Sequence, residues 1–150
     1  MVRPGNQALA ISLVAFLAVV SGAKAQTDIW GGGFPSDKVS VGSNWVGGVV
    51  PAGISAGSDT LVFNDASDSN MKINQTGVSF AGIMVTDPLA FGNNANIYGT
   101  NTLSIGSGGI TQVESGEDSI NTYIGTPIAL TATQPWTTVE GGYIQVTGAI

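Results

Sequence analysis

The sequence predicts an all-β protein of short strands stacked as a solenoid, and three observations lead to this fold class. Apolar and β-branched residues recur in short runs along residues 58–150, and many runs alternate apolar with polar side chains, as half-buried strands do. In residues 26–150, Gly or Pro interrupts every window with a helical apolar period, which disfavours helices. The runs are shorter than usual sandwich strands, and the Asn, Ser and Thr residues between them suit stacked corners. Because no fixed repeat period is visible, an antiparallel β-sandwich remains the alternative.

The N-terminal 25 residues have the three parts of a secretory signal peptide. Arg3 supplies positive charge, residues 8–20 form an apolar run with Ser12 as its one polar residue, and Ala23-Lys24-Ala25 provides small residues before Gln26. The apolar run has 13 residues, whereas a membrane-spanning helix needs ~20. We therefore expect cleavage after Ala25, with a retained anchor or a buried core helix as the alternatives.

The composition of the mature chain excludes several classes of function. Loss of Arg3 and Lys24 leaves two lysines against ten carboxylates, a net charge of about −8. Such an acidic chain is a poor partner for nucleic acid or anionic membranes. The chain has no Cys and no His, which removes thiol nucleophiles, the usual general base and the usual transition-metal ligands.

The expected strands follow one another with short, glycine-rich connections. They are residues 60–63, 78–80, 83–85, 96–98, 102–105, 110–113, 122–124, 128–130, 136–139 and 143–146. Glycines between them, such as those at 106–109, permit tight turns. The apolar members of these runs should face one long core, which we expect to contain Val62, Phe80, Ile83, Leu103, Ile105, Ile110, Ile124, Ile128 and Val146.

Residues 26–57 have a different character, with few strand-like runs. Trp30 and Trp45 lie among Gly and Pro turns, as expected for a cap over the open end of a strand stack, whose unpaired edge would otherwise promote aggregation. The alternative is a carbohydrate-binding module in which exposed Trp30, Trp45 and Trp136 stack on sugar rings.

Acidic side chains gather at two places, Asp65 with Asp68 and residues 114–118. Both lie in Gly-, Ser- or Asn-rich turns, where acidic residues commonly cap and solvate the chain. Neither has the spacing of an EF-hand calcium loop, and neither has a base nearby. We therefore expect no enzyme activity and no catalytic, cofactor-binding or metal-binding residue.

An ordered series of motifs resembles the N-terminal part of autotransporter-associated β-strand repeat proteins, which are large bacterial surface proteins. The motifs are Ile29-Trp30, Asn44-Trp45, Pro51, residues 57–63, residues 78–83, residues 103–110, Gln134-Pro135-Trp136 and residues 146–150. The resemblance implies a right-handed parallel β-helix passenger. The Gly-rich repeats and barrel that follow in that family are not found in these 150 residues.

The sequence therefore predicts three regions: a signal peptide (1–25), an N-terminal capping region (26–57) and β-solenoid coils (58–150) that are incomplete at the C-terminus. The expected function is an exported structural or adhesive surface module, secreted or located at the bacterial cell surface or outer membrane. Its expected partners are cell-surface glycans or neighbouring chains, with self-association through the C-terminal edge. We expect no nucleic acid partner and no membrane insertion by these residues.

Overall fold

The computed structural model describes residues 25–32, 36–64, 67, 70–86, 94–113 and 119–150. Residues 1–24 of the expected signal peptide lie outside this part, and so do Asp65, Asp68 and residues 114–118. The described residues form ten strands and two short 3₁₀ helices, with no α-helix among them. The prediction of a mostly β protein is confirmed.

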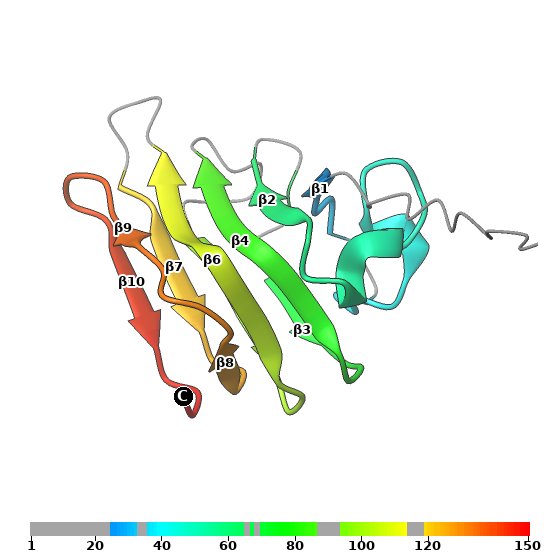
Figure 1. Ribbon diagram of the computed structural model, residues 1–150. Coiled ribbons are helices and arrows are strands. Elements are labelled where there is room, and N and C mark those ends of the chain that lie inside the picture. Colours follow the sequence, from blue (N-terminus) through cyan, green and yellow to red (C-terminus); the bar gives the residue numbers. More distant parts are fainter. Residues whose placement is uncertain (1–24, 33–35, 65–66, 68–69, 87–93, 114–118) are drawn as a thin grey trace, which may run out of the picture.

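The strands form two sheets whose pairings are all parallel within the described chain (Figure 1). The first sheet has the order β1-β2-β4-β6-β8, with β9 also paired to β6. Its strands are β1 (Thr27–Ile29), β2 (Thr60–Phe63), β4 (Val78–Thr86), β6 (Leu103–Val113), β8 (Ile128–Leu130) and β9 (Trp136–Thr137). The second sheet has the order β10-β7-β5-β3. Its strands are β3 (Asn70–Ile73), β5 (Asn94–Gly99), β7 (Asn121–Ile124) and β10 (Tyr143–Val146).

From β2 onward the chain passes back and forth between the two sheets, so that neighbours within a sheet come from successive turns of chain. Val78 pairs with Leu103 and Leu103 pairs with Ile128, so one turn takes 25 residues at this position. Parallel neighbours need such long crossover connections, which a hairpin cannot provide. The arrangement is consistent with a β-solenoid, and the alternative of an antiparallel sandwich is wrong.

The core lies between the sheets and is filled by alternate residues of each strand. In β5, for example, Ala95 and Ile97 are buried while Asn94 and Tyr98 are exposed. Of the nine expected core residues, eight are buried: Val62, Phe80, Ile83, Leu103, Ile105, Ile110, Ile124 and Ile128. Val62 does not belong to the main core cluster. The residues that β2 contributes to this cluster are Leu61 and Phe63. Val146 is only partly buried, because β10 is the last strand of its sheet.

The register of β4 and β6 shifts between Phe80 and Gly82, and an irregularity of this kind bends the strands locally. The sequence indicated a turn at residues 106–109, whereas the structure runs one continuous strand, β6, through this bend. Gly109 has a φ of +65°, and a Cβ there would lie 1.8 Å from the carbonyl oxygen of Pro135. The glycine therefore lets successive turns approach each other at the bend.

The described residues of the expected capping region, 26–32 and 36–57, lie at the end of the stack opposite β10 (Figure 1). They contribute β1 and the 3₁₀ helices η1 (Gly42–Asn44) and η2 (Ala52–Ser55). The rings of Trp30 and Trp45 make an edge-to-face contact with centroids 5.2 Å apart. Both indole N–H groups donate to backbone carbonyls, Trp30 to Asn70 and Trp45 to Val39, each at 2.9 Å. Both rings are buried and belong to the core cluster. Their N–H groups have hydrogen-bond partners, as buried indoles usually do.

Candidate functional sites

The outer face of the second sheet carries a regular array of amide and tyrosine side chains, which we call the Tyr–Asn face. Strand alternation directs these side chains away from the core, because the residues between them are buried or packed against it. The face consists of Asn70, Lys72, Asn94, Asn96, Tyr98, Asn121, Tyr123, Tyr143 and Gln145.

Asparagines at matching positions of successive turns bind one another across this face. Asn96 Nδ2 donates to Asn70 Oδ1 at 3.2 Å, and Asn121 Nδ2 donates to Asn94 Oδ1 at 3.1 Å. Both pairs are in direct register in the parallel sheet. At β10 the residue that pairs with Asn121 is Tyr143, and Asn121 Oδ1 has no partner among the described residues. The row of Asn94 and Asn121 therefore ends at β10, and the row of Asn70 and Asn96 continues with Tyr123 on β7.

The tyrosines give the face its aromatic surface. Tyr98 and Tyr143 are 37% and 42% exposed. The rings of Tyr123 and Tyr143 pack edge to face with centroids 5.4 Å apart, and their hydroxyls are hydrogen-bonded. This hydrogen bond raises the pKa of Tyr143. Tyr98 donates its hydroxyl to Asp37 Oδ2 at 3.0 Å. Amphipathic rings beside amide groups can stack on a sugar and hydrogen-bond its hydroxyls.

The structure separates the three tryptophans considered as sugar-stacking residues. Trp30 is fully buried and Trp45 is 3% exposed, so their rings lie in the core. Trp136 in β9 is 38% exposed and donates its N–H to Gln134 Oε1 at 3.3 Å. Of the three, Trp136 alone offers a ring to solvent.

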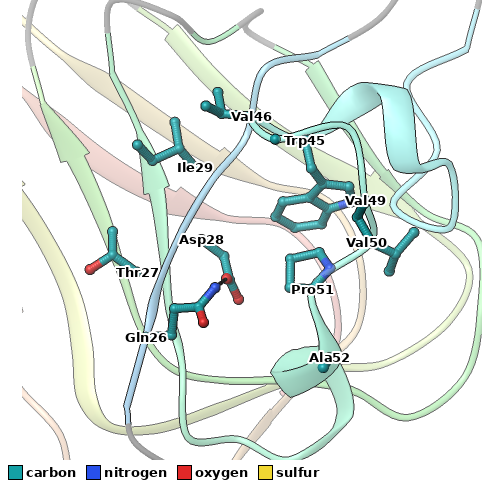
Figure 2. A pocket seen from close by; sticks show the side chains of 11 residues that line it. Gln26, Thr27, Asp28, Ile29, Trp45, Val46, Val49, Val50, Pro51 and Ala52 are labelled. Carbon is teal, nitrogen blue, oxygen red and sulfur yellow. Dashed lines mark hydrogen bonds between the residues drawn. The ribbon is translucent and has the colours of Figure 1, made fainter.

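A pocket of about 390 Å³ lies at the N-terminal end of the stack, between β1 and the loop that precedes η2 (Figure 2). Gln26, Asp28, Trp45, Val50 and Pro51 contribute to its wall. The side chain of Asp28 points into this region beside Gln26 in Figure 2. The pocket therefore combines apolar and neutral polar side chains with one buried carboxyl group.

Asp28 and Asp59 form a pair of buried carboxyl groups at this end, only 3% and 4% exposed. Burial, and next the negative charge of Asp59, raise the pKa of Asp28 to about 6, against the lowering effect of the hydrogen bond from Gln26. Asp59 packs against η2, where a Cβ on Gly53 would lie 1.4 Å from Asp59 Oδ2. The backbone of Gly53 therefore makes room for this carboxyl group.

Other kinds of site find little support in the described part of the chain. It contains no group of three or more His, Cys, Asp or Glu side chains that could hold a metal ion. Nor does any helix there have the length and apolar character needed to cross a bilayer. The acidic segments considered as calcium loops lie outside the described residues.

Comparisons with protein-family models, with curated proteins and with solved structures give no match to this chain. The geometry alone therefore defines the candidate sites. Sequence reasoning did not single out the Tyr–Asn face or the Asp28–Asp59 pair. The alternation in Asn94-Ala95-Asn96-Ile97-Tyr98 was a signal that polar residues share one face, but their partners on other strands depend on register.

Proposed function

We propose that this protein is an exported structural and adhesive surface module. In this proposal the chain is the N-terminal segment of an autotransporter-like passenger that folds as a right-handed parallel β-helix. It acts at the cell surface, or after secretion, by presenting the Tyr–Asn face on a stiff stack. The proposal includes no enzymatic step.

One observation carries this proposal: the same sheet that closes the core also displays Asn and Tyr side chains in register on its outer face. Rows with a fixed spacing suit contact with an extended or repeating partner. The two asparagine pairs hold their side chains in place before any partner binds, which lowers the entropic cost of binding. The chain has few cationic residues and a negative net charge, which disfavours nucleic acid as that partner.

Surface display is tested by expressing the full chain, with a C-terminal epitope tag, in a Gram-negative host. We expect the tag in the medium or accessible to protease on intact cells. Retention of the tag in the cytoplasm would contradict the proposal. A chain with the apolar run interrupted by Leu13→Arg serves as the control, because its signal region should fail.

A second candidate function is carbohydrate binding, and the exposed rings of Tyr98, Tyr143 and Trp136 favour it. Binding of the mature chain to immobilised polysaccharides should weaken on Tyr143→Ala if the Tyr–Asn face is the site, and on Trp136→Ala if β9 is the site. Leu130→Ala is a matched control, because Leu130 has a similar exposure, 45%, but is not aromatic and lies on β8. Unchanged binding in both aromatic variants would remove this candidate.

Neighbouring chains are the other proposed partners, through the edge of β10. Tyr143 and Thr147 donate backbone N–H groups towards β7, to Ile120 and Ile124. Because successive residues of a strand point to opposite sides, the peptide groups of Ile144 and Val146 face away from β7. No described strand pairs with that side. Such an edge favours pairing with a further coil or with another chain.

A further inference from the structure

Gln26 connects the two buried carboxyl groups at the N-terminal end. Its backbone N–H donates to Asp59 Oδ1 at 3.2 Å, and its side-chain Nε2 donates to Asp28 Oδ1 at 3.1 Å. The second oxygen of Asp28, Oδ2, is buried and has no hydrogen-bond partner among the described residues. One residue thus contacts both acids, while one acid oxygen still lacks a donor.

The described residues that line the pocket supply these acids with no counter-charge. The pocket beside Asp28 is lined by apolar and neutral side chains, without a Lys or an Arg. Two neighbouring carboxylates with so little access to water are costly to ionise together. A proton retained on Asp28 relieves part of this cost, and a cation close to Gln26 would relieve it while both acids stay ionised.

We propose that the Asp28–Asp59 pair binds the α-ammonium group of Gln26 that signal-peptide removal creates. The inference rests on the predicted cleavage after Ala25 and is independent of what the outer face binds. In the cleavage, a signal peptidase adds water across the Ala25–Gln26 peptide bond. Ala25 leaves as a carboxylate, and the Gln26 nitrogen gains protons and becomes an ammonium group.

This nitrogen needs no large movement to reach its site, because as an amide it already lies 3.2 Å from Asp59 Oδ1. Before cleavage it is neutral and donates one proton; afterwards it is charged and has three. The additional protons can serve the unpartnered oxygen at the Asp28–Asp59 pair. Removal of the signal peptide therefore stabilises the folded chain, and folding is favoured after export.

The same contacts protect the new terminus from a side reaction. An N-terminal glutamine cyclises when its free amine attacks its own side-chain amide carbon, which expels ammonia and leaves a neutral lactam. A bound ammonium has no lone pair for this attack, and the bond from Nε2 to Asp28 holds the side chain away from it. Folding should therefore slow cyclisation of Gln26.

The test compares three forms of the mature chain. One begins at Gln26, one carries the lactam made by glutaminyl cyclase on the unfolded chain, and one continues through Ala25 into a neutral linker. At pH 7 the unfolding equilibrium constant should be at least about tenfold smaller for the free terminus than for either neutral form, the equivalent of one pKa unit. Equal constants in all three forms would overturn the proposal.

Substitutions test whether the stabilisation by the free N-terminus depends on Asp28 and Asp59. The advantage of the free terminus should disappear in Asp28→Asn/Asp59→Asn and persist in Glu140→Gln, which removes an exposed charge. If the double variant does not fold, the loss of ammonia is followed by intact mass in the unaltered chain. Cyclisation at least tenfold slower in the folded state than in urea supports the proposal, and equal rates contradict it.

Discussion

Replacement of Trp45 by alanine tests whether the tryptophans at the N-terminal end stabilise the fold. Trp45 is 3% exposed, contacts Trp30 edge to face, and lies 6.3 Å from Phe80 between ring centroids. Its N–H satisfies the carbonyl of Val39 at 2.9 Å. The substitution therefore removes a large apolar surface, an aromatic pair and a buried hydrogen bond at once.

The magnitude follows from these contacts. A Trp side chain buries ~150–250 Å², which at ~25 cal/mol per Å² corresponds to about 4–6 kcal/mol as an upper bound. Partial collapse of the cavity lowers this figure, and the unpaired Val39 carbonyl adds ~1–3 kcal/mol. We expect a loss of about 4 kcal/mol in the free energy of unfolding, within the range of ~3–5 kcal/mol for Trp→Ala in cores.

The assay is thermal and urea unfolding of the mature chain, followed by circular dichroism. For a domain of this size the loss should lower Tm by roughly 10–20 °C. Trp136→Ala is the matched control, because Trp136 is 38% exposed and its removal should cost less than ~1 kcal/mol. An unchanged Tm for Trp45→Ala together with lost polysaccharide binding would refute the stabilising role and favour a carbohydrate-binding module.

Three further predictions concern the termini and the open edge. Secreted protein should have the intact mass of a chain that begins at Gln26, and a mass that retains Met1 to Ala25 would make this segment an anchor. In the chain extended through Ala25, stability should fall as pH rises from about 3.8 to about 6, because the raised pKa of Asp28 means that the folded state holds its proton more tightly than the unfolded state. This loss is at most about 3 kcal/mol, and Asp28→Asn should flatten the pH profile; a profile unchanged by Asp28→Asn would refute the assignment. The mature chain should self-associate in sedimentation at increasing concentration. Val146→Pro removes an outward N–H and should reduce this association, whereas Gln145→Pro should instead destabilise the fold by breaking a bond to β7; a strictly monomeric parent chain would contradict the open edge.

The sequence by itself determined the mostly β class and most strand positions. Residues 60–63, 128–130 and 143–146 were expected as strands, and β2, β8 and β10 occupy these positions. Apolar alternation is a local property, so it can be recognised without the fold. For the same reason, eight of the nine expected core residues are buried.

Two strands were not expected, and each owes its conformation to its neighbours. β1 lies in the region expected to be a cap, and β3 begins at Asn70, after a polar segment with turn-like composition. β1 pairs with β2, and β3 pairs with β5. Strand propensity depends strongly on such context, so pairing with a neighbouring strand determined the extended conformation of these two segments.

The tertiary structure alone decided parallel pairing, register and the composition of both candidate sites. Asn70 and Asn96 become neighbours only because successive turns align β3 with β5. Asp28 and Asp59 lie 31 positions apart in the chain and meet because β1 pairs in register with β2. Local residue patterns specify which face of a strand is buried, but contacts between distant strands depend on how the whole chain closes its core.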